Sequence, residues 1–346
     1  QPTVTSIYQD EFGIIWIGTK DGLNRYNGTD FYVFRPVKGD KNSLYNNNIG
    51  TICGDKQGHI YIRCKYAVVE YDIKKNTFHT IRDNDIQAIT YDNARLWVCT
   101  RDSLFTYNRV EDRLDYYYNL EGVRMSCVTE DSAGNLYVGT MNNGLYMIDH
   151  NKKWLNYFPK KDITCIYEDS KKSIWVGTKD DGLFRLDRNG GITNYGTAPH
   201  QNMLSSSYVR CVVEDNLGNY WIGTFKGLDK LDVTTGTFTH YSKDNKPYSL
   251  SNSSIICMMK DRQGTFWIGT YYGGVNLFNP DYEIYTYYYP DESQKGKLTS
   301  PFAGRMTEDS NGGIWIATEG GGVNYLDKKT KTFTEYKHDA TKNSLA

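Results

Sequence analysis

Residues Ile163 to Asp187 read ITCIYEDSKKSIWVGTKDDGLFRLD, and versions of this stretch recur eight times along the 346-residue chain. The copies begin near residues 4, 49, 86, 125, 163, 209, 255 and 303, with a period of about 36 to 48 residues. An Asp closes the first apolar run of every copy. An aromatic residue follows this Asp at a spacing of six residues in seven copies and of five in the copy at Asp92. The chain is therefore a repeat protein.

Each copy contains four short runs of β-branched and aromatic residues separated by turn residues, which is typical of β-strands. The Asp-x-x-Gly that follows the first run, as in Asp10 to Gly13, favours a tight hairpin. The Asp side chain can accept hydrogen bonds from backbone N–H groups two residues on, while Gly adopts a positive φ. Four strands per period indicate a β-propeller in which each repeat forms one blade and the aromatic residue packs between blades.

We therefore expect an all-β fold, with a single β-propeller domain of four-stranded antiparallel blades over residues 1–346. Eight blades are favoured, because both ends of the sequence coincide with the boundary of a repeat. In that arrangement blade eight packs on blade one without strand exchange. The alternative is a ring of seven blades, with one repeat belonging to a following domain.

Composition limits the possible partners. The formal net charge of -1 argues against nucleic acid or an anionic membrane surface as the main partner. No run of about 18 apolar residues is present, so no membrane span is encoded here. The sequence at Gln1 shows no signal-peptide pattern, which leaves a cytosolic chain or a segment of a longer or processed protein.

Four of the seven cysteines, Cys127, Cys165, Cys211 and Cys257, share one position in the first strand of successive copies. Small residues suit this position because the innermost strands crowd the axis of a propeller, so we expect buried thiols. The chain has no CxxC motif, and the ring symmetry does not favour tetrahedral metal binding, so we expect no redox motif, metal or cofactor. Arg305 interrupts this column and would point toward the axis, where it needs a carboxylate, a carbonyl or an anionic ligand.

The phrase Asn-Ser-Leu, followed by Val-x-x-Ile-x-x-Asp-x-x-Gly-x-x-Trp-Ile-Gly-Thr-x-x-Gly-Leu-x-x-Tyr-Asp, closely resembles the two-component regulator propeller repeat. The match is best over Val4 to Asn27, Ile163 to Asp187, Val209 to Asp232 and Ile255 to Asn279. Members of this family usually carry more than eight repeats, often in two rings of seven followed by a small β-sandwich.

The resemblance implies a periplasmic sensor region of a hybrid two-component regulator from Bacteroides-type gut bacteria. It implies detection of an oligosaccharide released by polysaccharide breakdown, and control of polysaccharide-utilisation genes. It also implies further sensor domains and a membrane-linked histidine kinase elsewhere in the same polypeptide. We expect the signal to pass through domain rearrangement or through the geometry of a homodimer.

A specific function should lie where the copies differ, since the positions they share hold the frame. One face of a propeller is built from the loops between the second and third strands and from the connections between blades. Aromatic and charged residues on these segments suit a sugar, whose apolar face stacks on a ring while its hydroxyls take fixed polar partners. The Tyr271-Tyr272 pair is the most favoured, because consecutive bulky aromatics in a loop are hard to explain by solvation. The candidate ligand-binding residues are Tyr271, Tyr272, Phe225, Lys226, Lys179, Asp180, Arg101, Lys20, Tyr45, Tyr248 and Arg305.

Catalytic motifs are missing from the sequence: it contains no GxSxG, HExxH, phosphate-loop or kinase motif. We therefore predict no catalytic residues and no enzymatic activity in this segment. The favoured function is a ligand-sensing module that passes its signal to a kinase outside the segment. The alternatives are a protein-protein interaction scaffold that uses the propeller face and a propeller polysaccharide lyase or hydrolase.

Overall fold

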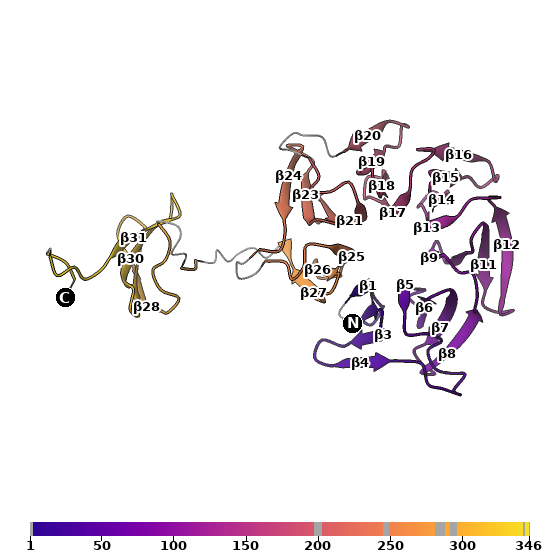
Figure 1. The fold of residues 1–346 in the computed structure, drawn as a ribbon, viewed down its shortest axis with the longest axis horizontal. Helices are drawn as coiled ribbons and strands as arrows, with labels where there is room; N and C mark the ends of the chain where they lie inside the picture. Colours follow the sequence, from indigo (N-terminus) through magenta and orange to yellow (C-terminus); the bar gives the residue numbers. More distant parts are fainter. Residues whose placement is uncertain are drawn as a thin grey trace. The chain divides into compact units, whose positions relative to one another are not determined.

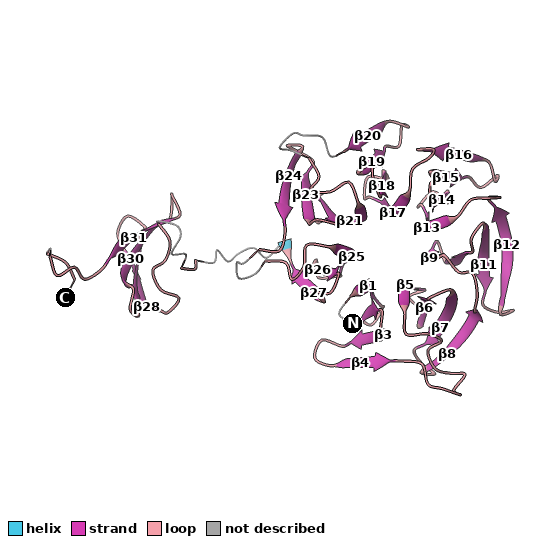
Figure 2. Cartoon of the chain, viewed as in Figure 1, coloured by secondary structure: helices cyan, strands magenta, loops and turns pink. Residues whose placement is uncertain are grey.

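The computed structural model describes residues 3–196, 203–244, 249–280, 288–290, 296–341 and 343–345. The chain divides into two compact units, Gln1–Asp281 and Tyr282–Ala346. Strands joined by turns and loops make up nearly all of the regular structure (Figure 2). Within the described residues, no helix is long and apolar enough to cross a membrane.

The first unit contains seven antiparallel sheets, numbered here blade one to blade seven in chain order. Blades one and two contain β1 Val4–Gln9, β2 Ile15–Thr19, β3 Gly22–Tyr26, β4 Phe31–Phe34, β5 Ile49–Gly54, β6 His59–Cys64, β7 Ala67–Asp72 and β8 Thr77–Arg82. Blades three and four contain β9 Ala88–Asp92, β10 Arg95–Cys99, β11 Ser103–Asn108, β12 Arg113–Asn119, β13 Met125–Glu130, β14 Leu136–Thr140, β15 Leu145–Ile148 and β16 Trp154–Tyr157. Blades five to seven contain β17 Ile163–Glu168, β18 Ile174–Thr178, β19 Leu183–Leu186, β20 Ile192–Tyr195, β21 Val209–Glu214, β22 Tyr220–Thr224, β23 Leu228–Asp232, β24 Thr237–Tyr241, β25 Ile255–Lys260, β26 Phe266–Thr270 and β27 Val275–Phe278.

The seven blades form a closed ring with their first strands innermost (Figure 1). Each first strand contacts the first strand of the next blade, and β25 of blade seven contacts β1 of blade one. The described strands of each sheet follow one another in sequence, so no strand exchange is seen among them. The ring closes on its own, by packing between blades seven and one.

The eighth repeat forms a sheet of its own in the second unit, with β28 Ala303–Glu308, β29 Ile314–Thr318, β30 Gly322–Asp327 and β31 Thr332–Tyr336. The all-β propeller predicted from the sequence is confirmed, but the favoured ring of eight blades in one domain is not what the structure shows. The structure corresponds to the alternative, seven blades with one repeat in a following unit. The reason is that β1 already covers β25, which leaves no free blade face at the closure of the ring.

The Asp at the end of each first strand organises both the turn and the packing between blades. In blade five, Asp169 Oδ1 accepts hydrogen bonds from the backbone N–H groups of Lys171 and Ser173 at 2.9 and 2.8 Å. Its other oxygen, Oδ2, accepts the indole N–H of Trp175 at 2.8 Å. The same oxygen accepts the hydroxyl of Tyr220, in blade six, at 2.7 Å. The spacing of six residues therefore places the indole where it reaches the carboxylate of its own turn.

Blade three shows why its spacing of five residues is tolerated. The indole of Trp97 donates to Glu130 Oε2 of blade four at 2.8 Å instead of to the Asp of its own turn. Asp92 Oδ2 accepts the backbone N–H of Glu130 at 3.1 Å. The Asp92 carboxylate thus binds the backbone of the neighbouring blade. The indole of Trp97 still donates to a carboxylate, that of Glu130.

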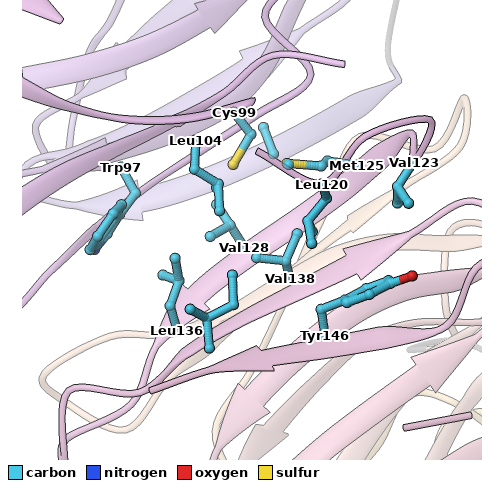
Figure 3. Close-up of a cluster of buried hydrophobic side chains, with 12 residues drawn as sticks. Trp97, Cys99, Leu104, Leu120, Val123, Met125, Val128, Leu136, Val138 and Tyr146 are labelled. Atoms are coloured by element: carbon cyan, nitrogen blue, oxygen red, sulfur yellow. The ribbon is translucent and has the colours of Figure 1, made fainter. Parts of the chain in front are cut away.

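Aromatic and aliphatic side chains fill the spaces between blades, as predicted for the repeated aromatic position. Figure 3 shows one such cluster between blades three and four, and its labelled members are Trp97, Cys99, Leu104, Leu120, Val123, Met125, Val128, Leu136, Val138 and Tyr146. In blade five, Trp175 is fully buried, and its ring centroid lies 4.1 Å from that of Tyr220. Each interface therefore joins side chains from two repeats, and a single blade cannot bury them alone.

The column of four cysteines packs against a column of glycines. Cys165 in β17 lies opposite Gly177 in β18, and a Cβ added to Gly177 would lie only 2.5 Å from the sulfur. The equivalent pairs are Cys127 with Gly139, Cys211 with Gly223, and Cys257 with Gly269. The thiols were expected to be buried, and the four residues are half-buried; the missing side chain of the facing glycine explains how a sulfur fits there.

We predict that these thiols are unreactive in the folded chain. Burial raises the pKa of Cys127 and of Cys257 to about 12. At pH 8 the thiolate fraction falls roughly a thousandfold below that of a free cysteine. Titration with a thiol-specific disulfide reagent at pH 8 should give no fast phase for the native protein and rapid reaction in denaturant. Fast stoichiometric labelling of either thiol in the native protein would contradict the prediction.

Candidate functional site

One face of the ring is built from the loops that join second to third strands and from the connections between blades. Backbone hydrogen bonds tie these two sets of segments together around the ring. Phe225 N donates to Tyr208 O at 3.0 Å, Tyr271 N donates to Ser254 O at 2.9 Å, and Lys179 N donates to Asp162 O at 3.0 Å. We call this side of the ring the loop face. Its residues are held by the backbone and not only by side-chain packing.

Three of the predicted residues come together on the loop face where the ring closes. Tyr271 and Tyr272, in the loop after β26, meet edge to face with ring centroids 4.4 Å apart. Lys20, in the loop after β2 of blade one, places Nζ 5.9 Å from the centroid of the Tyr271 ring. Tyr272 N donates to Thr3 Oγ1 at 3.3 Å, which also joins blades seven and one.

Blade six continues this line of aromatic rings. The rings of Tyr208 and Phe225 are stacked, with centroids 6.2 Å apart and planes at 14°. The guanidinium of Arg210, in β21, lies 4.5 Å from the Tyr208 centroid and 5.1 Å from the Phe225 centroid. Arg210 Nη1 donates to Ser254 Oγ at 2.8 Å, and the backbone of Ser254 holds Tyr271, so one residue links the two aromatic pairs.

We call this continuous set the aromatic rim: Tyr208, Arg210, Phe225, Tyr271, Tyr272 and Lys20. Three of its rings are exposed, with 51% of Phe225, 41% of Tyr271 and 51% of Tyr272 accessible to solvent. Exposed aromatic rings held at fixed positions can stack on the apolar face of a sugar, and the neighbouring cations can hydrogen-bond to its oxygens. A hydrogen bond with Tyr272 raises the pKa of the Tyr271 hydroxyl above its ordinary value.

Other predicted residues share the loop face but are not part of the aromatic rim. Lys226 adjoins Phe225 and is exposed. Lys179 and Asp180 lie in the loop after β18 of blade five, where Lys179 Nζ is 4.0 Å from Asp162 Oδ2. Arg101 lies in blade three, and its backbone N–H donates to Asp85 Oδ2 at 3.3 Å.

Two predicted residues lie away from the aromatic rim, and a third falls outside the described residues. Tyr45, in the connection between blades one and two, lines a surface hollow with Val37 of the same connection and His79 of the outer strand β8.

 Tyr248 lies outside the described residues. Arg305 was expected to point toward the axis of the ring, and this prediction is wrong. It lies exposed on β28 of the second unit, because the eighth repeat is not a blade of the ring and its first strand borders no axis.

Sequence reasoning missed Arg210, the cation at the centre of the rim. Its position holds Ser126 in blade four and Thr164 in blade five, whose hydroxyls donate to the first-strand carbonyls of the next blades, Ile163 O and Val209 O. Arg210 makes the equivalent bond to Ile255 O at 3.0 Å, and its longer side chain also reaches the aromatic rings. A charged residue in a column that otherwise holds uncharged residues was the signal that could have identified it.

Blade two has an arginine where most blades have the glycine of the Gly-Thr pair. Arg63 lies over Gly50, which leaves room for the guanidinium, and Nη1 donates to Lys65 O at 2.9 Å. Burial lowers the pKa of Arg63. Arg63 and Gly50 thus form a matched pair that keeps the first two strands of this degenerate blade packed together.

The described residues contain no group of three or more His, Cys, Asp or Glu side chains placed to hold a metal ion. The site therefore consists of aromatic rings, cations and backbone groups. Such a surface suits binding, and its hydrogen-bond partners define an orientation for a polar ligand.

Comparison with known proteins identifies repeats of one family. The model described as "Two component regulator propeller" matches residues 1–21, 157–180, 203–226 and 249–272. A curated protein, histidine kinase P4 of Formosa agariphila, is 41% identical over 44 residues, which cover 13% of this chain and 3% of that protein.

Solved structures share the fold. The extracellular domain of a hybrid two component system from B. thetaiotaomicron has a TM-score of 0.70 at 24% identity, and the match covers 98% of this chain and 53% of that one. The extracellular domain of a one component system from the same species has a TM-score of 0.66 at 21% identity, with 97% and 52% covered. This chain therefore spans about half the length of these relatives. Virginiamycin B lyase from Staphylococcus aureus has a TM-score of 0.64 at 12% identity, with 80% and 94% covered.

Proposed function

Because four segments of this chain match the two-component regulator propeller model, we propose that it is the ligand-sensing part of a periplasmic sensor and that it binds an oligosaccharide at the aromatic rim. The observation that carries the proposal is the line of exposed rings across blades six and seven, fixed by Tyr208 O and Ser254 O. Exposed aromatics have no reason to be held in place for solvation alone. Stacking on a sugar ring uses both their apolar faces and their fixed positions.

The context of the solved relatives supports the sensing role. Two of them are extracellular domains of two component and one component systems, and a short segment resembles a histidine kinase. In this proposal a kinase elsewhere in the polypeptide carries the output and controls genes for polysaccharide use. Binding at the rim would bridge the closure between blades seven and one, and further sensor domains or a homodimer would pass the change onward.

We also propose that the segment is not an enzyme. The rim holds no carboxylate pair and no nucleophile with an adjacent base among its residues, which are Tyr208, Arg210, Phe225, Tyr271, Tyr272 and Lys20. The likeness to virginiamycin B lyase concerns the fold alone, at 12% identity. Binding without bond cleavage is therefore the expected behaviour.

Thermal-shift screening against polysaccharide digests tests this function. A digest that contains the ligand should raise the melting temperature, because a ligand at a hundred times its Kd stabilises the folded state by about 2.7 kcal/mol. Chromatography of the digest after incubation should show unchanged oligosaccharides. No stabilisation by any digest, with a protein partner recovered instead, would support an interaction scaffold, and shortened oligosaccharides would support a lyase or hydrolase.

A further inference from the structure

The guanidinium of Arg210 is held in place but not neutralised. Nη1 donates to Ser254 Oγ at 2.8 Å and to Ile255 O at 3.0 Å. Across the described ranges, neither Nε nor Nη2 has a hydrogen-bond partner. These two nitrogens form the edge with which a guanidinium binds a carboxylate or a sulfate in a bidentate manner.

Some other arginines of the ring have carboxylate partners. Arg109 donates to both oxygens of Glu70, at 3.0 and 3.1 Å, and Arg35 pairs with Asp21 at 3.0 Å. Arg210 forms no ion pair within the part of the chain that the structure describes. A partly buried cation without a counter-charge is costly unless a ligand supplies one.

The carboxylate that blade six does place near the loop face is already occupied. Asp229, in β23, is fully buried and lies 2.7 Å from His240 Nδ1. It also accepts hydrogen bonds from the backbone N–H and the hydroxyl of Ser205, at 2.8 and 2.9 Å. Asp229 is therefore committed to the packing of its own blade.

The lysines of the same part of the loop face are also without carboxylate partners. Lys20 and Lys226 form no ion pair with any described residue. On blade five, in contrast, Lys161 pairs with Asp181 at 2.6 Å. Arg210, Lys226 and Lys20 thus carry positive charge without a carboxylate partner among the described residues, although the whole chain has a net charge of only -1.

We infer that the aromatic rim selects an acidic oligosaccharide, one that carries a carboxylate or a sulfate, and that Arg210 binds the anionic group. This inference rests on the proposed function, because it names the class of saccharide that the same site takes. The free edge of Arg210 binds the anion, Lys20 and Lys226 add positive charge, and the exposed rings of Phe225 and Tyr271 stack on the sugar. Arg210 is then the residue that determines specificity.

Matched pairs of short oligosaccharides test the inference by isothermal titration calorimetry. One pair is oligogalacturonides and their methyl esters, and the other is sulfated carrageenan oligosaccharides and the same oligosaccharides after desulfation. For the 346-residue chain, the acidic member of a pair should bind about tenfold or more tightly than its neutral partner. The two pairs also distinguish a carboxylate from a sulfate ligand.

Arg210→Gln should weaken the acidic member about tenfold or more and bring its affinity close to that of the neutral member. Arg188→Gln is the control, since it removes an exposed arginine from the turn between β19 and β20, at the opposite end of its blade, and should leave binding unchanged. If Arg210→Gln lowers the melting temperature of the protein, Arg210→Lys provides the test. It keeps the charge and loses the planar edge, so acidic selectivity should fall while neutral binding stays the same.

The outcomes separate the inference from the function on which it rests. Equal binding of acidic and neutral members, unchanged by Arg210→Gln, would overturn the acidic selectivity and leave saccharide sensing intact. Failure of all four probes to bind would overturn both.

Discussion

Replacement of Asp169 by Ala is expected to lower the free energy of unfolding by about 3–5 kcal/mol, the largest stability loss that we expect from a single polar residue of the ring. The change removes the acceptor of the Trp175 indole at 2.8 Å and of the Tyr220 hydroxyl at 2.7 Å. Both donors are buried, so in the variant each becomes a buried polar group without its acceptor, which lowers the stability of the folded state. Chemical denaturation of the purified variant measures the loss.

Asp187→Ala is the matched control. Asp187, in the turn between β19 and β20, also accepts two backbone N–H groups, from Asn189 at 2.8 Å and from Gly191 at 2.7 Å. It is exposed and has no indole or hydroxyl partner among the described residues, so its loss should cost only about 1 kcal/mol. Equal losses for the two variants would show that the turn, and not the contact between blades, accounts for the stability.

The Asp169 network also predicts a dependence on pH. Burial by itself raises the pKa of Asp169, but the hydrogen bonds from Tyr220, Trp175 and the turn outweigh it and lower the pKa below its ordinary value. The stabilisation is then present above the unfolded pKa of about 3.9 and is lost as pH falls through the lower folded value. Wild-type protein should therefore lose more stability than Asp169→Ala between about pH 5 and pH 2.

The double variant Tyr271→Ala with Tyr272→Ala is expected to show the largest effect on function. The two rings meet at 4.4 Å and stand exposed at the centre of the rim. Their removal should cost roughly 2–4 kcal/mol of binding free energy for the stabilising oligosaccharide, because aromatic anchors dominate such sites. Stability should change by no more than about 0.5 kcal/mol, since both side chains lie at the surface. Calorimetric titration and thermal melting measure the two quantities separately.

Phe12→Ala is the control for this variant. Phe12 is a more exposed aromatic, 68% accessible, and lies in the turn between β1 and β2, on the opposite side of blade one from the loop after β2. Its loss should not affect the binding of the oligosaccharide. Equal weakening by Phe12→Ala, or unchanged affinity in the double variant, would place the binding surface elsewhere.

The repeat predicted the blade well because its shared residues act within one blade or between neighbours. The Asp to Trp spacing was visible in the sequence, and the structure supplies its cause, the bond from the indole of Trp175 to Asp169 Oδ2. The same applies to the cysteine column, where Cys165 faces Gly177. Such local contacts recur in several copies, so comparing the copies reveals them.

The number of blades in the ring could not be predicted by comparing the copies. At the closure, a Cβ added to Gly269 of blade seven would meet the side chain of Val4 in blade one, as one added to Gly223 would meet Ile255 of the next blade. The first repeat therefore offers blade seven the same kind of contact that each repeat offers the one before it. The eighth repeat keeps the Asp-to-Trp spacing of the blades, so this spacing does not mark it as lying outside the ring.

The rim was found in part because its aromatics lie in loops, where differences between copies are easy to see. Phe225, Tyr271 and Lys20 were identified in this way. Arg210 lies within β21, and its contact with Tyr208 depends on how blade six packs against blade seven through Ser254. The prediction for Arg305 was wrong for a related reason, since the surroundings of this residue depend on whether its repeat joins the ring.

Hydrogen-deuterium exchange with and without the stabilising oligosaccharide tests most directly whether the aromatic rim is the binding site. The account predicts added protection at the loops that contain Phe225 and at Tyr271 and Tyr272, whose segments are held by the carbonyls of Tyr208 and Ser254. The turns on the opposite side of the ring, such as Asp187 to Gly191, should exchange as before. Protection confined to those turns or to the second unit, Tyr282–Ala346, would contradict the account.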